Sequence, residues 1–378
     1  MDRISLFNPE HDMALANGSK FFIAPKNIRE MACDLASLLD VVDGDGVLVW
    51  GWDSVAKQHL LRMGVVEELL PTDMALASLR RCSERQSAHY LLHAFRTDYL
   101  EGPYVGTSII ARDMDAIAAY AIEHEHIILK NPLSSSGKGL RHVNLNENDN
   151  ENTNKSKTSS EQSSSSLSKI TNWAESLIRR HGYLTAEPYY NKVQDFAMEF
   201  CVDGAGCHFV GYSLFTTNAH GRYEGNQLME DERIESQLAR YISHSVLHEV
   251  RDWVISHHYL IVPTEWNVAK HPLYFGIDMM LVAEEQGESY KLHPCVEINL
   301  RLNMGIVAHE VRRKLLAPGV EGTFHVVAFP SEEAVCRFFQ EQTEKYPPVC
   351  REGKFVSGYH PLTPIHPHTR HHAYVVCG

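Results

Sequence analysis

The sequence lacks any apolar run near the roughly 20 residues that a membrane-spanning helix needs, so we expect no membrane protein. It is also short of basic residues: 35 Lys and Arg stand against 48 Asp and Glu, which gives a formal net charge of −13. A surface with that balance repels polyanions, so nucleic acid is not expected as a partner. The first ten residues lack the apolar core of a secretory signal, and we predict a cytoplasmic protein.

Several motifs that identify common classes of enzyme are also missing. The eight cysteines include no C-x-x-C pair, so we expect reduced thiols and no zinc site. Neither H-E-x-x-H nor G-x-S-x-G occurs, which argues against a zinc protease and against a Ser-His-Asp hydrolase. Histidines cluster between residues 360 and 372, but Pro361, Pro364 and Pro367 stand among them. We therefore expect a solvated tail or closing loop there rather than a metal site.

The chain of 378 residues is long enough for more than one hydrophobic core, because single cores stop growing at roughly 250 to 300 residues. One segment stands apart. Residues 144–169 are almost all Asn, Ser, Glu, Thr and Lys, which offer too little apolar surface to offset the entropy of ordering, so we predict a disordered insertion. Its flanks have structured patterns: a strand-like run at 127–130, and Trp173, Leu177 and Ile178 at helical spacing. The insertion therefore interrupts a domain.

The first hundred residues alternate between strand-like and helix-like patterns. Strands are predicted at 4–7, 47–50 and 65–70, with helices near 28–39 and 54–62. Such alternation is typical of a small parallel α/β unit.

The second half of the chain favours antiparallel structure. Strand patterns at 194–202 and 208–215 flank a Gly-containing turn, which predicts a hairpin. A single apolar stripe predicts one long helix over about 234–254. Two further strand patterns, at 274–282 and 290–300, are joined by polar residues and predict a second hairpin. The fold class is therefore α/β, with an α+β part after the insertion.

A candidate phosphate-binding loop follows Lys130, which ends the apolar run at 127–130. Residues 131–139 are rich in Ser and Gly, and such a loop lets backbone N–H groups approach phosphate oxygens while lysines neutralise their charge. It is not the common G-x-x-x-x-G-K-[ST] loop, because Pro132 and Gly139 stand where glycine and a hydroxyl residue are required. Alone, the stretch is typical of a flexible surface turn.

A candidate metal site lies on the second predicted hairpin. In a strand, residues two apart share a face, so Glu297, Asn299 and Arg301 point the same way at steps of roughly 6.6 Å. With Asp278 from the partner strand they form an oxygen-ligand set of the kind that Mg²⁺ accepts. The alternative is a solvated outer face of an edge hairpin.

Two further stretches each allow two interpretations. Glu187 stands before Pro188 at the end of a strand pattern, and an acidic strand that carries Asp195 follows. This connection is either a hinge between lobes or an ordinary acidic connector. Residues 8–12 follow the first predicted strand, where ligands sit in open α/β sheets, so they either meet a second substrate or simply open a helix. The loop that carries His220 and Arg222 likewise either reaches a second substrate or is a plain turn.

Taken in order, these pieces resemble the ATP-grasp superfamily over roughly residues 113–305. The family pattern is a strand-ending lysine, a Gly- and Ser-rich lid loop, a hinge glutamate, an acidic residue at the ribose, and D…E-x-N for magnesium. Many members continue with an arginine and a glycine-bearing loop, matched here by Arg301 and Gly305. Many also carry an additional lysine at the front of the small lobe, where Arg85 is the nearest counterpart.

The resemblance implies an ATP-grasp fold preceded by a small Rossmann-like α/β domain. It divides the chain into the preceding domain at 1–110, a small lobe at 111–186 that carries the insertion 144–169, and a large lobe at 187–378. The implied nucleotide-binding residues are Lys130, Ser135, Ser136, Gly137, Lys138, Gly139, Glu187 and Asp195. The implied metal ligands are Asp278, Glu297 and Asn299, and the implied catalytic residues are Arg301 and Lys130.

The activity that the resemblance implies is an ATP-dependent, ADP-forming ligase. Such enzymes join a carboxylate to an amine, a thiol or a similar nucleophile through an acyl phosphate, with ATP and Mg²⁺ bound. The implied partners are therefore small molecules, and a homodimer is left open. A kinase on the same scaffold and a non-catalytic nucleotide-binding module are the alternatives, and retention of all three metal ligands weighs against the second.

Overall fold

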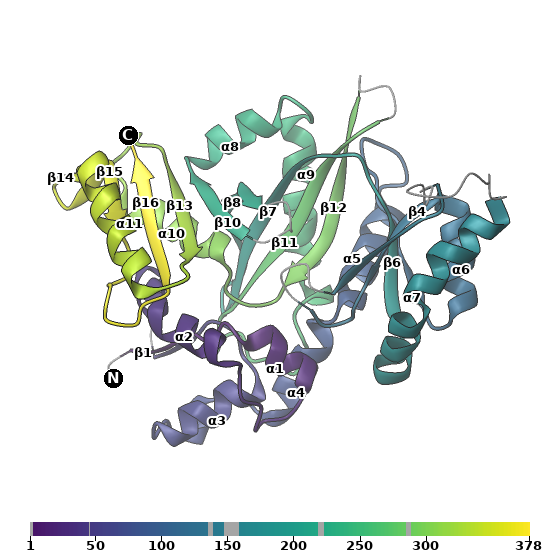
Figure 1. Ribbon diagram of the computed structural model, residues 1–378, viewed down its shortest axis with the longest axis horizontal. Helices are drawn as coiled ribbons and strands as arrows, with labels where there is room; N and C mark the ends of the chain where they lie inside the picture. Colours follow the sequence, from purple (N-terminus) through teal and green to yellow (C-terminus); the bar gives the residue numbers. More distant parts are fainter. Residues whose placement is uncertain (1–2, 45, 135–138, 147–158, 218–222, 285–288) are drawn as a thin grey trace.

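Four β-sheets organise the computed structural model, which describes residues 3–44, 46–134, 139–146, 159–217, 223–284 and 289–378. A small sheet with its helices lies at one end of the molecule and the C-terminal sheet at the other, with the central sheet between them (Figure 1). The first four helices lie along one side of this row. No helix among the described residues is long and apolar enough to cross a membrane.

The N-terminal unit contains a parallel pair of strands, β1 (Ile4–Leu6) and β2 (Val47–Val49). The predicted third strand at 65–70 is wrong, because Glu67–Leu69 form a single 3-10 turn between the buried Val65 and Leu70. The predicted helix at 28–39 is divided between a helix and a 3-10 segment. The helical elements of this unit are α1 (His11–Asn17), α2 (Lys26–Asp34), η1 (Ala36–Val41), α3 (Ser54–Arg62), η2 (Glu67–Leu69), α4 (Asp73–Cys82) and α5 (Arg85–Asp98).

The small lobe is an antiparallel sheet in the order β3-β6-β4-β5, with two helices packed against it. Its elements are β3 (Ile109–Ala111), α6 (Met114–His124), β4 (His126–Lys130), β5 (Leu140–Asn144), α7 (Ser159–His181) and β6 (Leu184–Pro188). The predicted disordered insertion at 144–169 is wrong at both ends, since Asn144 belongs to β5 and 159–169 belong to α7. Leu167 and Ile170 pack into the core of this lobe, and apolar contact of that kind stabilises a helix whose composition alone would not. Residues 147–158 lie outside the described part of the chain.

The start of α7 at Ser159 separates residues that can be deleted from residues that pack in the lobe. Replacing 147–158 by a short Gly/Ser bridge should leave the melting temperature within a few degrees of the wild type, because those residues offer almost no apolar side chains to a core. Extending the deletion to Ser168 should lower it much further, since Leu167 then leaves the lobe core. Differential scanning calorimetry of the two deletions compares them directly, and equal melting temperatures would count against a packed start of α7.

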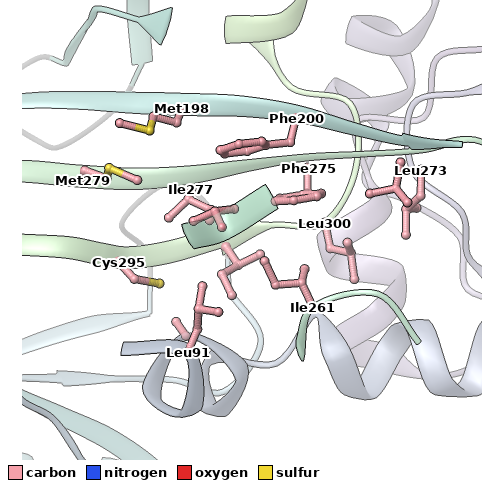
Figure 2. Packing of buried hydrophobic residues seen from close by; sticks show 14 of the residues in the cluster. Leu91, Met198, Phe200, Ile261, Leu273, Phe275, Ile277, Met279, Cys295 and Leu300 are labelled. Atoms are coloured by element: carbon pink, nitrogen blue, oxygen red, sulfur yellow. The ribbon is translucent and has the colours of Figure 1, made fainter. Parts of the chain in front are cut away.

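The central sheet is antiparallel and runs in the order β12-β11-β7-β8. Its strands are β7 (Lys192–Asp203), β8 (Gly206–Ser213), β11 (Leu273–Ala283) and β12 (Tyr290–Asn299). Both predicted hairpins are present, and β11 of the second pairs with β7 of the first. Successive residues point to opposite faces, so Phe200, Phe275 and Ile277 share one apolar face. Figure 2 shows these side chains meeting Leu91 of α5 and Ile261 beneath the sheet.

The predicted long helix at 234–254 is wrong in one respect, because it is two helices. They are α8 (Asp231–Leu238) and α9 (His244–Ser256), followed by η3 (His258–Leu260). Ser243 has an extended backbone and begins the second helix. The apolar stripe nevertheless continues across the break, since Leu238, Ile242 and Leu247 all lie in the same buried cluster as the central sheet. Periodicity therefore identified the buried face but not the interruption.

The C-terminal part forms a sheet in the order β14-β15-β16-β13-β10-β9. Its elements are β9 (Phe215–Thr217), β10 (Tyr223–Leu228), α10 (Met304–Leu315), β13 (Gly322–Ala328), α11 (Glu332–Lys345), β14 (Val349–Arg351), β15 (Lys354–Pro361) and β16 (His371–Cys377). The expectation of a solvated tail or closing loop is wrong for His360 and His372, which are buried in β15 and β16, whereas His366 and His368 lie exposed in the loop between these strands. His372 bonds Tyr359 through Nε2 at 2.5 Å and Thr363 through Nδ1 at 3.0 Å. The two buried histidines are satisfied core residues.

Candidate functional site

The face of the central sheet opposite its apolar core carries the acidic residues. Asp278 of β11 lies directly opposite Glu297 of β12, and Gly276 lies opposite Asn299. On β7, Asp195 pairs with Met280 and so shares this face with Asp278. The alternating pattern of three neighbouring strands therefore gathers these polar side chains on one surface.

Asp278, Asn299 and Arg301 form one hydrogen-bonded group. The amide Nδ2 of Asn299 donates to Oδ1 of Asp278 at 3.2 Å, and Nη2 of Arg301 donates to Oδ1 of Asn299 at 3.3 Å. Burial raises the pKa of Asp278, and the negative charge of Glu297 raises it further. Two half-buried carboxyl groups that repel each other form a site that favours a cation.

Arg301 connects this group to the N-terminal unit. Its Nε and Nη2 donate to the two carboxylate oxygens of Asp12 at 3.1 and 3.0 Å, a two-point contact that fixes the plane of the guanidinium. Burial alone would raise the pKa of Asp12, but the adjacent Arg301 outweighs burial and holds it below its usual range. Asp12 thus remains an anion, and α1 is attached to the end of β12.

Arg85 approaches the same hairpin from the other side. It is the first residue of α5, its backbone N–H donates to the carbonyl of Pro132 at 3.0 Å, and its Nη2 lies 3.1 Å from Oε1 of Glu297. The side chain is only 8% exposed, and its Nε has no hydrogen-bond partner in the described part of the chain. Arg85 therefore meets a predicted metal ligand.

Lys130 and Glu187 form a buried ion pair between β4 and β6 of the small lobe. The ammonium contacts Oε1 of Glu187, and the two side chains are 7% and 9% exposed. The same ammonium donates to the carbonyl of Val296 at 3.3 Å, which connects the small lobe to β12 of the central sheet. Lys130 therefore lies where the two sheets meet.

The lid loop after Lys130 is described only at its ends. The backbone N–H of Asn131 donates to the carbonyl of Gly139 at 2.9 Å, so the two ends of the loop are held together. A Cβ at Gly139 would lie 2.2 Å from Oγ of Ser134, and this close approach requires glycine there. The predicted nucleotide-binding residues of the loop interior, Ser135, Ser136, Gly137 and Lys138, lie outside the described residues, and so do His220 and Arg222.

The predicted site residues thus fall into three groups. Asp278, Asn299 and Arg301 are joined by hydrogen bonds, with Glu297 at the position opposite Asp278. Lys130 is paired with Glu187, and Asp195 is bonded to Lys192 at the start of β7. No contact joins Asp195 to Glu187 among the described residues, although the charge of Asp195 reaches Asp278.

A cleft opens between the hairpin end, α1, the start of α5 and the loop after Lys130. Its charged side chains have both signs, and its floor is β12. The residues that line it are His11, Asp12, Ser83, Glu84, Arg85, Ala88, Pro132, Leu133, Ser134, Glu297, Ile298, Asn299, Leu300 and Arg301. Three parts of the chain that are distant in sequence therefore meet at the predicted metal ligands.

Sequence reasoning missed Glu199, which is buried on the polar face of β7 and accepts a hydrogen bond from Nδ2 of Asn303 at 2.7 Å. A Cβ at Gly276 would lie 2.4 Å from one carboxylate oxygen of Glu199, and a Cβ at Gly305 would lie 2.1 Å from the other. Both positions therefore need glycine to leave room for the Glu199 side chain. The expectation that Gly305 lies in a loop is wrong, because it is the second residue of α10. The signal was available, since Glu199 stands four residues after Asp195 and shares its face.

Glu199 should give the stability a dependence on pH. Burial raises its pKa to about 8, against 4.5 for an exposed glutamate. Between these values the folded protein holds a proton that the unfolded chain has released, so stability should fall as pH rises, by at most about 1.4 kcal/mol per pH unit. Glu199→Gln keeps the acceptor for Asn303 and should reduce this slope, leaving the smaller contribution of Asp278.

Melting curves of wild type and Glu199→Gln at pH 5 and pH 8.5 test this expectation, with the exposed Glu232→Gln of α8 as the control. The Glu199→Gln variant should gain stability relative to wild type at the higher pH, and a constant difference across the range would contradict a protonated Glu199.

Taken together, the elements define an α/β protein in which the buried Lys130 contacts β12, the strand on which Glu297 lies opposite Asp278. Within the described residues no group of three or more His, Cys, Asp and Glu side chains is placed to hold a metal ion, so the predicted set is limited to two carboxylates and an amide. No family model and no curated protein sequence matches the chain.

Solved structures do match it. N5-carboxyaminoimidazole synthetase from Staphylococcus aureus complexed with ADP is 11% identical over 98% of this chain and 92% of that one, with a TM-score of 0.50. N5-carboxyaminoimidazole synthase from Aspergillus clavatus is 10% identical over 100% and 94% (TM-score 0.49), and L-amino acid ligase from Bacillus licheniformis is 11% identical over 100% and 93% (TM-score 0.47). The likeness to the first shows that the chain has the ATP-grasp fold, which confirms the fold that the sequence resemblance implied.

Proposed function

We propose that the protein is an ATP-dependent, ADP-forming ligase that joins a carboxylate to an amine or a similar nucleophile. The observation that carries the proposal is the connected group of Arg301, Asn299 and Asp278, together with the buried Lys130, whose ammonium donates to the carbonyl of Val296 on the same strand as Asn299. The structure from Staphylococcus aureus with the same fold supports it, since that protein is a synthetase complexed with ADP.

In this proposal the nucleotide lies between the two sheets. Lys130 neutralises its phosphates, the lid loop covers them, and the hinge at Glu187 and the acid Asp195 meet the base and the ribose. The proposed contacts of the lid are Ser135, Ser136, Gly137, Lys138 and Gly139. Residues 1–110, 111–186 and 187–378 then act as the preceding domain, the small lobe and the large lobe.

Magnesium fits the donor set of the hairpin. Asp278 and Glu297 offer carboxylates from facing positions and Asn299 an amide oxygen, which are the hard oxygen ligands that Mg²⁺ prefers. A bound cation would also relieve the repulsion that contributes to the raised pKa of Asp278. Bound there, magnesium would supply charge neutralisation at the phosphates.

The reaction has two steps. First, an oxygen of the substrate carboxylate attacks the γ-phosphorus of ATP, the bond to the β-phosphate breaks, and ADP leaves. Phosphoryl transfer depends mainly on positioning and on cations beside the equatorial oxygens, and Lys130 and Arg301 would supply two of them. Second, the nucleophile attacks the acyl carbon of the mixed anhydride and inorganic phosphate leaves.

Hydroxylamine trapping tests the proposal. A panel of amino acids and small carboxylates is incubated with protein, ATP, Mg²⁺ and hydroxylamine, and hydroxamate is measured by mass spectrometry alongside ADP. At least one carboxylate should give hydroxamate and ADP in equal amounts. ADP with a stable phosphorylated product and no hydroxamate would indicate a kinase, and no ADP with any carboxylate would indicate a binding module.

A further inference from the structure

A buried histidine–aspartate pair lies beside the cleft, and its histidine, His11, is one of the lining residues. Nδ1 of His11 lies 2.9 Å from Oδ2 of Asp53, and the two side chains are 2% and 3% exposed. His11 is the first residue of α1, and Asp53 immediately precedes α3. The two residues are separated by 42 positions in the sequence, and no local pattern connects them.

Asp53 is fixed from several sides. Its Oδ1 accepts from the backbone N–H groups of Val55 and Ala56 at 2.7 and 2.8 Å, so the carboxylate also caps α3. Its Oδ2 accepts from Nδ2 of Asn8 at 3.2 Å. Asn8 is itself held by two hydrogen bonds with the backbone of Gly51, at 2.9 and 3.1 Å. The Asp53 carboxylate is therefore held in place by two backbone N–H groups and by the hydrogen-bonded side chain of Asn8.

The imidazole of His11 is equally constrained. A Cβ at Gly51 would lie 2.3 Å from the ring, so the ring packs directly on the glycine backbone. With Nδ1 at a carboxylate, the neutral ring carries its proton on Nδ1 and presents Nε2 as an acceptor. Among the described residues Nε2 has no hydrogen-bond partner, and His11 lines the cleft.

The position of the ring places it beside the predicted reaction centre. Asp12, the next residue of α1, holds Arg301 by two hydrogen bonds, and Arg301 contacts Asn299. The cleft floor below is the end of β12. An acceptor nitrogen is therefore held at the end of the cleft where a nucleophile would approach an acyl group close to Arg301.

We propose that His11 is the general base of the second step, oriented by Asp53 as a positioning residue. The inference rests on the proposed ligase function. As the nucleophile nitrogen forms its bond to the acyl carbon, one of its protons passes to Nε2 of His11 and the C–O bond to phosphate breaks, so that phosphate leaves with the electron pair. The nucleophile is an amine of ordinary basicity, which loses one proton to become the free base that attacks and a second as the amide forms.

Two small nucleophiles of similar size separate this role from a structural one. Ammonia is largely protonated at neutral pH, whereas hydroxylamine is largely unprotonated and needs less help from a base. His11→Gln should lower kcat for amide formation from ammonium chloride by about 100-fold or more, and lower hydroxamate formation by less than about 10-fold. The exposed His59→Gln of α3 is the matched control and should change neither rate.

Equal losses with the two nucleophiles would show that His11 only supports the cleft, and equal retention would show that it is not the base; either result overturns the inference. Asp53→Asn should give the same preference for hydroxylamine in weaker form.

If the His11→Gln variant melts early, His11→Ala supplies the second measurement, because added imidazole should restore amide formation specifically. Failure of the wild type to release ADP with any carboxylate would instead overturn the ligase proposal, and the inference with it.

Discussion

Replacing Asp278 by asparagine should remove at least about 99% of ATP turnover while leaving the folded protein as stable as the wild type or more stable. Loss of one of two carboxylates from a magnesium site weakens binding of the metal and of the phosphates together, for which about 100-fold is a conservative figure. Stability should move the other way, because Asp278 is half-buried opposite Glu297 and a neutral side chain of the same shape removes that repulsion.

The combination of the two effects makes this result informative. Most inactive variants of buried residues are also destabilised, so loss of activity alone does not identify a ligand. Urea denaturation should give an unfolding free energy at or above that of wild type, and the rise in melting temperature caused by MgATP should largely disappear. Asp252→Asn, an exposed change on α9, should keep both turnover and the MgATP response. Wild-type turnover in the Asp278→Asn variant would contradict the proposed metal site.

Lys130→Met should both abolish turnover and destabilise the fold by about 3 to 5 kcal/mol. The stability loss follows from the ion pair with Glu187, since removing one partner leaves the other as an uncompensated charge in a buried position. The turnover loss follows from the proposed role of the ammonium at the phosphates. The single variant therefore mixes two effects.

The double variant Lys130→Met, Glu187→Gln separates them. With the buried charge removed from both partners, most of the unfolding free energy should return, while turnover should stay absent because no cation replaces the ammonium of Lys130 at the phosphates. Chemical denaturation of wild type, both single variants and the double variant gives the coupling energy of the pair. A double variant that remained as unstable as Lys130→Met would show that the ion pair is not the source of the loss, and recovered ATP turnover would contradict the role of Lys130.

The sequence predicted the parts of the site that depend on strand periodicity. Glu297 and Asn299 alternate with apolar residues, so their common face follows from the two-residue repeat of a strand, and the polar connection to the strand of Asp278 predicts the hairpin that brings the carboxyls together. Arg301 was predicted by the same repeat, but it lies beyond the end of β12, in a bend where its N–H donates to the carbonyl of Asn299. The same rule would have found Glu199. Strand pairing within a hairpin is local, which is why these predictions held.

The remaining contacts of the site depend on how distant elements pack, which periodicity does not describe. Asp12 meets Arg301 across 289 positions of sequence. Composition misled at α7, because a polar helix start is stabilised by Leu167 and Ile170 in the lobe core rather than by its own residues. It misled again at His372, whose ring nitrogens find Tyr359 and Thr363 inside a sheet, so that a polar residue is buried at little cost.

The register of β4 and β5 has a practical consequence for attaching probes to this protein. Lys130 pairs with Leu140 and His126 with Asn144, so the two ends of this strand pair are separated by four residue steps, roughly 13 Å. The chain leaves β5 at the end remote from the lysine, and the lid loop leaves β4 at the near end. A fluorophore or an affinity tag inserted after Asn146 would therefore be fixed to the small lobe without standing over the cleft, and would report on movement of that lobe against the central sheet.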